Sequence, residues 1–190
     1  MAEESSIDSA RIHHGDMTAR LLVNLQVNGS RLDTLRLGDA EMEGAQLTDV
    51  ILTGCDLSNA VLHRSSCTRV DCNDSKLVGV RANESSWKDV HFEDCVADAL
   101  QVQQSRLQRV RFSRCRLRGA LFNGTDLSGA VFDACDLREA DFSNAVLTGA
   151  DLRRSNIEGI RIGPEGLQGV TLTQDQALYV IGILGVTIGV

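Results

Sequence analysis

Proline and basic residues are both scarce in this chain of 190 residues. A single proline and an even composition leave no segment that reads as a linker, so we expect one elongated unit. Lys and Arg number 19 against 26 Asp and Glu, for a formal net charge of −7. This deficit of positive charge disfavours nucleic acid and anionic membranes as direct partners. It suits a basic partner surface, including one that normally holds DNA, and it also suits simple solubility.

Long apolar runs are scarce as well. The apolar stretch from Ala177 to Val190 is shorter than a bilayer-spanning helix requires. The beginning of the chain lacks the basic segment and apolar run of a secretory leader. We therefore expect a cytoplasmic protein that does not enter a membrane.

Signals of catalysis, cofactor binding and metal binding are missing too. No glycine-rich phosphate loop occurs, and the four histidines are scattered over the chain without a nucleophile or a carboxylate at catalytic spacing. The six cysteines show no Cys-x-x-Cys spacing, so we expect free thiols that pack inside the protein as small apolar groups. The sequence predicts no catalytic residues, no cofactor and no metal site, and hence no enzyme.

The sequence does contain a repeat unit of five residues, called here the repeated phrase, which recurs without interruption from Ala120 to Ser155. Each phrase has a large apolar residue at its centre, a small residue two positions earlier and polar residues at the other positions. The centres in this stretch are Phe122, Leu127, Phe132, Leu137, Phe142, Leu147 and Leu152. A helix has an apolar period near 3.6 and a half-buried strand a period of 2, so a period of five indicates a corner at every fifth residue. The pattern predicts an all-β solenoid.

Glycine and charge patterns indicate how many corners close one coil. Glycine gathers two residues after the centres, as at Gly124, Gly129 and Gly149, where a corner favours positive φ. Four corners would stack residues twenty apart at about 4.8 Å. The outward column at that spacing alternates in charge wherever charges meet: Asp16, Arg36, Asp56, Lys76, Val96, Arg116, Asp136 and Asn156. The same spacing predicts these ion pairs: Asp94 with Arg114, Asp98 with Arg118, Asp133 with Arg153, and Arg138 with Glu158.

Both ends depart from the repeat. Residues 1–21 keep its phase, but Arg20 fills an inward position, so we expect an irregular first coil or cap within a β-helix that covers residues 1–172. Thr173 and Gln176 form a capping box ahead of an apolar run, which predicts a short helix from about Gln174 to Ile183.

The segment 173–190 holds more apolar residues than a cap needs. Leu178, Val180 and Ile181 suffice to cover the open edge of the last coil. An apolar surplus on a surface is typical of a partner interface, so we expect a two-fold homodimer through this tail. The predicted dimerisation residues are Tyr179, Ile183, Leu184, Val186 and Ile188.

The repeated phrase, as in Ala140-Asp141-Phe142-Ser143-Asn144, resembles the pentapeptide-repeat proteins over roughly residues 7–172. The resemblance implies a right-handed quadrilateral β-helix. Asp175-Gln176-Ala177, the apolar run and Gly185-Val186-Thr187-Ile188 are together similar to the C-terminal dimerisation segment of the MfpA/Qnr-type proteins of that family. Those proteins interact with DNA gyrase and are associated with fluoroquinolone resistance. The resemblance implies a DNA-mimicking rod that binds gyrase or a related type II topoisomerase and protects or inhibits it, although the loop insertions of Qnr proteins are absent.

Negative charge gathers by coil rather than along one face. One group comprises Asp33, Asp39, Glu41, Glu43 and Asp49, and a second, called here the acidic cluster, comprises Asp133, Asp136, Glu139, Asp141 and Asp151. The acidic cluster lies near the predicted dimer end, where a DNA-binding saddle would grip the middle of a dimeric rod. We expect these five residues to bind the partner in place of DNA phosphates.

A different class of function stays open. A repeat rod can also be a non-enzymatic scaffold that binds an unrelated regulatory protein, because a fold does not determine a function. A gyrase supercoiling assay distinguishes the two hypotheses.

Overall fold

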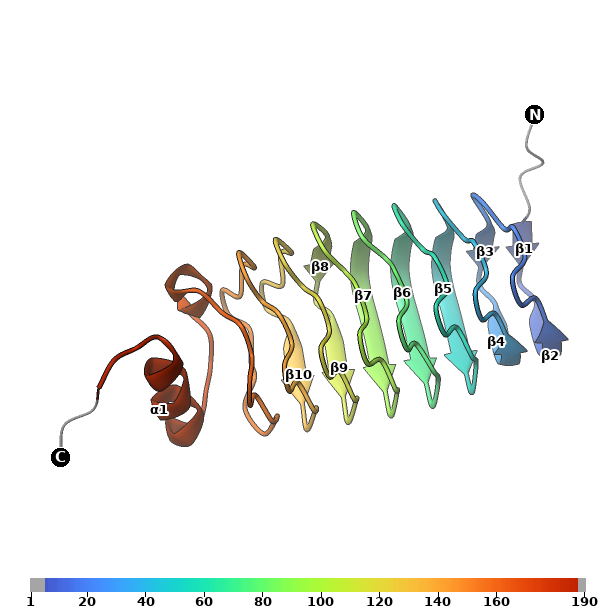
Figure 1. Ribbon diagram of the computed structural model, residues 1–190. Coiled ribbons are helices and arrows are strands. Elements are labelled where there is room, and N and C mark those ends of the chain that lie inside the picture. Colours follow the sequence, from blue (N-terminus) through green and yellow to red (C-terminus); the bar gives the residue numbers. More distant parts are fainter. Residues whose placement is uncertain (1–5, 188–190) are drawn as a thin grey trace.

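Parallel strands that recur at every twentieth residue organise the structure, a computed structural model that describes residues 6–187. The strands are β1 (Ser6–Asp8), β2 (Arg11–Asp16), β3 (Gln26–Asn28), β4 (Arg31–Arg36), β5 (Gln46–Thr53), β6 (Ser66–Asn73), β7 (Ser86–Glu93), β8 (Arg106–Gln108), β9 (Arg111–Ser113) and β10 (Val131–Asp133). Their main pairing order is β1-β3-β5-β6-β7-β9-β10, with β2, β4 and β8 paired beside it. Leu47 lies between Val27 and Cys67, at intervals of twenty residues. This register confirms the predicted coil, and Figure 1 shows the coils stacked into a rod.

Most strand residues occupy two neighbouring sides of the coil, and β2 and β4 continue around the corners at His14 and Thr34 onto a third side. β5, β6 and β7 each bend around a corner, at Asp49, Arg69 and Asp89, so each strand serves both sides. Beyond β2 and β4, the other two sides are joined by single parallel bridges, such as the bridge between Asp56 and Lys76. The column of alternating charge predicted from the sequence therefore runs along one of the bridged sides.

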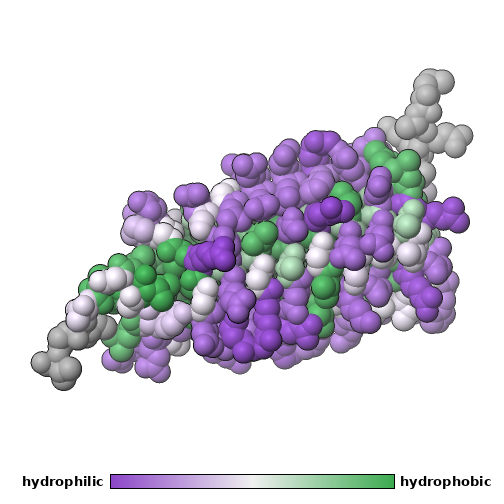
Figure 2. Space-filling view, viewed as in Figure 1, coloured by the Kyte–Doolittle hydropathy of each residue, from purple (hydrophilic) through white to green (hydrophobic). Residues whose placement is uncertain are grey.

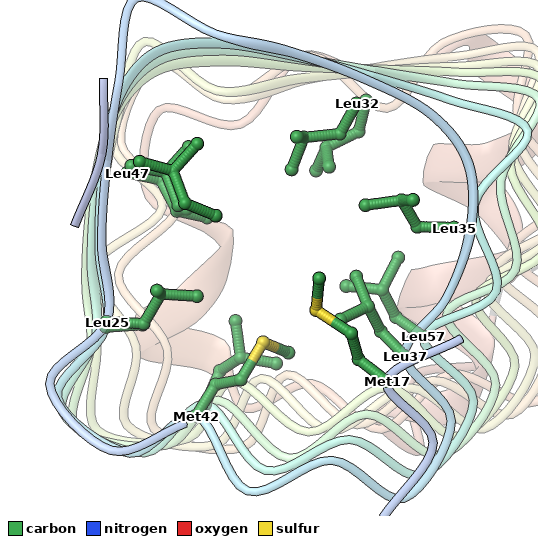
Figure 3. Close-up of a pocket in the computed structure, with 13 residues that line it drawn as sticks. Met17, Leu25, Leu32, Leu35, Leu37, Met42, Leu47 and Leu57 are labelled. Carbon is green, nitrogen blue, oxygen red and sulfur yellow. The ribbon is translucent and has the colours of Figure 1, made fainter. Parts of the chain in front are cut away.

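The coil is four-sided and right-handed. Figure 3 looks along the rod from its N-terminal coils, and in that view Leu32, Leu37, Met42 and Leu47 follow one another clockwise as the chain recedes. Each of these side chains points inward from a different side. The right-handed quadrilateral β-helix expected from the family resemblance is confirmed.

Residues in the left-handed region of φ make the corners. A corner turn closes when the N–H of the following residue donates to a carbonyl three residues earlier, as from Ala40 to Leu37 at 3.2 Å. Glycine adopts this φ without a steric penalty, and Gly129 and Gly149 have φ of +71° and +73°. Asp49 has φ of +56°, which costs an L residue some backbone strain. At such corners the stacking of coils outweighs the local preference.

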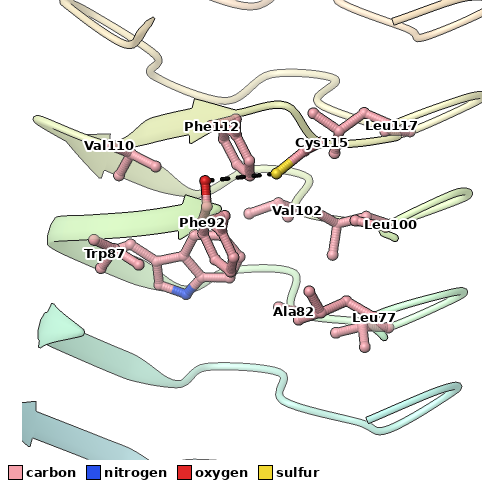
Figure 4. Close-up of a cluster of buried hydrophobic side chains, with 14 of the residues drawn as sticks. Leu77, Ala82, Trp87, Phe92, Leu100, Val102, Val110, Phe112, Cys115 and Leu117 are labelled. Atoms are coloured by element: carbon pink, nitrogen blue, oxygen red, sulfur yellow. Dashed lines mark hydrogen bonds between the residues drawn. The ribbon is translucent and has the colours of Figure 1, made fainter. Parts of the chain in front are cut away.

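Aromatic stacks fill the core of the C-terminal coils. Phe112 lies between Phe92 and Phe132, with ring centroids 4.8 and 5.1 Å away, and Phe122 stacks on Phe142 at 5.2 Å. Figure 4 shows Phe112 above Phe92 at the centre of a cluster of buried side chains. All five rings are buried. Because stacked rings gain contact energy beyond their burial, these columns stabilise the C-terminal half of the rod.

The six cysteines are buried free thiols. Burial raises the pKa of the Cys67 thiol to about 12, so this side chain stays protonated at neutral pH. A hydrogen bond with Cys115 and burial keep the pKa of Cys95 near the same value of about 12. Neutral thiols pack as small apolar groups, in agreement with the inward position predicted for them.

The first coil has the same parallel register as its successors in residues 6–16, through β1 on β3 and β2 on β4. Its inward side chains Ile7, Ile12 and Met17 are only half-buried, since the described residues cover them from one side only. Arg20 and Leu21 are exposed. The sequence-based division into an irregular cap, a repeat and a tail at residues 21 and 172 stays a prediction.

Two short helices cover the far end of the rod. The 3-10 helix η1 (Pro164–Leu167) is followed by α1 (Gln174–Ile183), whose bounds are those predicted from the sequence. Thr173 and Gln176 form the expected capping box. The Gln176 side chain also donates to the carbonyl oxygens of Leu152 and Ser155 at 2.9 and 2.8 Å, so the cap is tied to the last coil.

Candidate functional site

Charged side chains and the capped end are the prominent surface features of the rod. Figure 2 shows a mostly hydrophilic surface, with apolar side chains gathered over α1. Among residues 6–187, no three His, Cys, Asp or Glu side chains are grouped so that they could hold a metal ion. The same residues contain no helix of the length and apolarity needed to cross a membrane.

The acidic cluster is spread over three of the four sides. Asp133 and Asp151 share the side formed by β9 and β10. Asp136 lies on the next side, and Glu139 makes the corner after it, with φ of +61°. Asp141 lies on the side that follows this corner. The five carboxylates therefore surround one end of the rod and do not form a single acidic face.

Two arginines hold the carboxylate of Asp136. The Nε of Arg118 donates to it at 2.6 Å, and the Nη2 of Arg138 donates at 2.7 Å. The Asp136 side chain keeps 24 % of its surface exposed. Its local charge is therefore compensated on both flanks.

Three more members of the acidic cluster have one arginine each. Arg153 donates to Asp151 at 2.7 Å. Arg154 lies 3.1 Å from Asp133, and Arg161 lies 3.4 Å from Asp141. Glu139 is exposed and has no ion pair among the residues that the structure describes. Glu139 is therefore the one member of the acidic cluster without an ion pair in the part of the chain that the structure describes.

Several predicted ion pairs are replaced by diagonal ones. The pair of Asp94 and Arg114 is confirmed, with Nη2–Oδ2 at 2.8 Å. Asp98 binds the guanidinium of Arg116 and receives only the backbone N–H of Arg118. Three predicted ion pairs are wrong: Asp98 with Arg118, Asp133 with Arg153, and Arg138 with Glu158. In each case the arginine reaches a carboxylate beside or diagonal to its own column. Arg118 and Arg138 both bind Asp136, and Arg153 binds Asp151.

Hydrogen bonding favours the ionised form of the paired aspartates. Hydrogen bonds from Arg153 lower the pKa of Asp151 below its ordinary value of 3.8. Partial burial opposes ionisation of Asp141, but hydrogen bonds from Ser143 and Asn123 and the charge of Arg161 together outweigh it, and the pKa is again lowered. Arg69 and Arg114 lower the pKa values of Asp49 and Asp94 in the same way.

We expect the rod to lose stability as the pH falls below about 4. The folded-state pKa values of Asp49, Asp94 and Asp151 lie below 3.8, so the unfolded chain binds protons first as the pH falls. The stabilisation is fully present above the unfolded pKa and is lost progressively below it. Circular dichroism melts from about pH 7 to about pH 2.5 measure the effect. A melting temperature that stays constant over this range would contradict it, and Asp94→Asn is expected to reduce the acid-dependent loss.

The capped end exposes apolar side chains. Leu178, Ile183, Leu184 and Val186 are 44, 43, 37 and 56 % exposed. Tyr179 is half-buried against the core, and its hydroxyl accepts a hydrogen bond from the N–H of Gly159 at 2.6 Å. Ile188 lies outside the described residues.

The covering of the last coil differs from the sequence-based expectation. Val180 is buried as expected, but Leu178 and Ile181 are exposed at 44 and 37 %. Tyr179, which the sequence assigns to the dimer interface, is half-buried and packs on the last coil, and its contact with a partner copy stays a prediction. The phenol bridges the end of the rod because its hydroxyl can satisfy a backbone N–H that an aliphatic side chain would leave unpaired.

Comparison with known proteins matches the repeat to established families. The pentapeptide repeat region matches residues 85–162, and pentapeptide repeats in 8 copies match residues 40–71, which together make up more than half of the chain. No curated protein matches the chain in sequence.

Solved structures of the same repeat are similar along the chain. QnrB1, a plasmid-mediated fluoroquinolone resistance protein, has 20 % identity and a TM-score of 0.46, with 98 % of each chain covered. HetL, involved in heterocyst differentiation regulation in the cyanobacterium Nostoc, has 21 % identity and a TM-score of 0.33, with 89 % of this chain and 90 % of HetL covered. A pentapeptide repeat protein of the Arabidopsis thaliana thylakoid lumen has 30 % identity and a TM-score of 0.37, with 45 % of this chain and 68 % of that chain covered.

Proposed function

The chain belongs to the pentapeptide-repeat proteins, and we propose that it acts without catalysis, as a cytoplasmic rod that binds DNA gyrase or a related type II topoisomerase in place of DNA. Binding of this kind protects or inhibits the enzyme and gives tolerance to quinolones or to toxins that target gyrase. The choice of partner rests on the sequence resemblance to the MfpA/Qnr-type proteins. The rod itself contacts neither nucleic acid nor a membrane.

The observation that carries the proposal is the position of the acidic cluster beside the exposed apolar end. Asp133, Asp136, Glu139, Asp141 and Asp151 lie in the last coils before η1 and α1. A two-fold dimer through the α1 end would bring two copies of the acidic cluster together at the middle of a longer rod. A duplex-binding saddle engages the middle of its ligand, so this arrangement offers it carboxylates from both copies.

The arginine partners of the acidic cluster do not exclude binding to a basic surface, but they reduce the number of carboxylates that are free to pair with it. Asp133, Asp136, Asp141 and Asp151 already accept hydrogen bonds or ion pairs from arginines of the same rod. A basic partner must share these carboxylates with their arginines, whereas Glu139 is free to pair directly. We therefore expect Glu139 to contribute more to binding than any other member of the acidic cluster.

Reversal of charge within the acidic cluster tests the proposal. We expect the variant with Glu139→Lys and Asp133→Lys to raise the concentration needed for half-inhibition of gyrase supercoiling by about tenfold or more, because it replaces attraction to a basic surface by repulsion. The measurement is a supercoiling titration of purified gyrase with and without a cleavage-stabilising quinolone.

A matched variant makes the test specific. Asp74 and Glu84 are exposed corner residues with φ of +51° and +59°, and they lie in the middle of the chain. Asp74→Lys with Glu84→Lys changes the net charge by the same amount and is expected to leave inhibition within about twofold of the wild type. If the folded variant with Glu139→Lys and Asp133→Lys inhibited gyrase as well as the wild type does, the proposed role of these residues would be contradicted.

A second candidate function has an observation in its favour. Because four of the five acidic-cluster carboxylates are paired with arginines, the sides of the rod carry alternating charges that suit a protein surface of mixed charge. A scaffold for an unrelated regulatory protein fits this surface. Indifference of both gyrase and topoisomerase IV to the wild-type rod would select this function over the first.

A further inference from the structure

A hollow opens on the side of the rod that carries β9 and β10, next to the beginning of α1. Its volume is about 480 Å³, and its lining includes Arg111, Arg153, Arg154 and Thr173. Val131 pairs with Arg111 on one side and with Asp151 on the other. The short valine side chain between two longer ones leaves the space that the hollow occupies.

Positive charge exceeds negative charge in the lining of the hollow. Three guanidinium groups, of Arg111, Arg153 and Arg154, face two carboxylates, of Asp133 and Asp151. Arg153 pairs with Asp151, and Arg154 pairs with Asp133. Arg111 is exposed and has no ion pair among residues 6–187. A chain of formal net charge −7 therefore keeps a guanidinium without an ion pair in a concave site, where its charge also helps to lower the pKa of Asp151.

We propose that this hollow binds a phosphate group, either inorganic phosphate or the phosphate of a monoester, with Arg111 as its main ligand. A guanidinium presents a planar fork of N–H donors that matches two phosphate oxygens. Arg153 and Arg154 line the same space and add positive charge while they remain paired with their aspartates. Thr173 is the N-cap of α1, so the positive end of the helix dipole also lies at the rim.

The hollow shares Asp133 and Asp151 with the acidic cluster, but binding of phosphate to it does not require that the rod binds a topoisomerase. An occupied hollow would nevertheless change the surface beside the acidic cluster, because a dianion outweighs the one surplus positive charge of the lining. The side that carries Asp133 and Asp151 would then be net negative. A bound phosphate group therefore acts on the charge of this side without any change in the fold.

Titration of the full-length protein with inorganic phosphate, at constant ionic strength against chloride, tests the site. The readout is the set of arginine Nε–Hε signals in a ¹H–¹⁵N NMR spectrum. We expect the signals of Arg111, Arg153 and Arg154 to shift along one saturating curve. Arg111→Gln is expected to weaken binding about tenfold, because a hydrogen-bonded charge contact is lost.

The matched control is Arg106→Gln, which removes the same charge from an exposed arginine that lies 3.8 Å from Asp126 on the neighbouring side. Phosphate binding by this variant is expected to equal that of the wild type, and circular dichroism checks that both variants are folded. Phenyl phosphate distinguishes the two sources, since saturable binding of both probes assigns a monoester site and binding of phosphate alone assigns a site for the free ion. Non-saturating shifts of all arginines, or equal losses in the two variants, would overturn the proposal.

Discussion

Phe112→Ala is expected to lower the free energy of unfolding by about 3–5 kcal/mol. Phe112 is fully buried, and its ring is stacked between Phe92 and Phe132 at 4.8 and 5.1 Å. Phe122 meets the same ring edge-on at 6.3 Å. Truncation removes the contacts with all three rings and leaves a cavity that the coils above and below cannot close, because parallel backbone pairing fixes their separation. The loss is therefore expected at the upper part of the range for a buried aromatic residue.

Urea or thermal unfolding followed by circular dichroism measures this effect. For a chain of this size, 1 kcal/mol corresponds to about 2–4 °C in melting temperature, so a fall of roughly 6–20 °C is expected. Val146→Ala is the control, since Val146 is a surface side chain with 48 % exposure, and its change should stay within about 0.5 kcal/mol. A Phe112 variant as stable as the control would show that the aromatic column does not support the rod.

The register of the coil could be read from the sequence because one repeated phrase encodes it many times. One inward position can hold an unsuitable residue by chance, as the position of Arg20 does. The pairing of Val27, Leu47, Cys67 and Trp87 at intervals of twenty nevertheless leaves little freedom for another register. The corners follow from the same period. Glycine at Gly129 and Gly149 marks them, and Asp49, an L residue that tolerates this region, adopts the same left-handed φ.

Ion pairs could not be predicted as well as the register. The backbone places Asp136 between Arg116 and Asn156 in its column, yet its hydrogen bonds come from Arg118 and Arg138. Arginine side chains are long enough to reach neighbouring columns, and exposed pairs differ little in energy. Sequence spacing therefore identifies which residues are stacked, whereas the choice of partner depends on side-chain conformations that the repeat does not encode.

The candidate site shows the same division. The twenty-residue spacing already assigns Asp133 and Asp151 to one side of the coil, Asp136 to a second side and Asp141 to a third. The spread of the acidic cluster over three sides could therefore be predicted from the sequence. The hollow beside Arg111 was not, because it depends on the volume of Val131 between longer side chains. The position of Tyr179 against Gly159 likewise depends on how α1 crosses the last coil.

Substitution of Ile183→Asp together with Leu184→Asp is expected to convert a homodimer into a monomer. These side chains are 43 and 37 % exposed at the end of α1, next to Val186 at 56 %. Burial of an aliphatic side chain against a partner copy contributes up to about 1.5–3 kcal/mol, and a two-fold interface counts each substitution twice. Carboxylates in that interface would also lose hydration without gaining a basic partner. We expect the dissociation constant to rise by about 100-fold or more.

Light scattering after size-exclusion chromatography measures the mass, and the opposite end of the rod supplies the control. Leu21 is 70 % exposed at the first coil, so Leu21→Asp introduces the same carboxylate at the other end of the rod and is expected to leave the dimer intact. A wild-type protein that is monomeric, or a dimer that Leu21→Asp dissociates, would contradict an interface at α1. If the dimer forms through α1, the monomeric variant should also lose topoisomerase inhibition, although its acidic cluster is unchanged. Each rod would then present Glu139 and its neighbours at a free end rather than at the centre of a longer ligand.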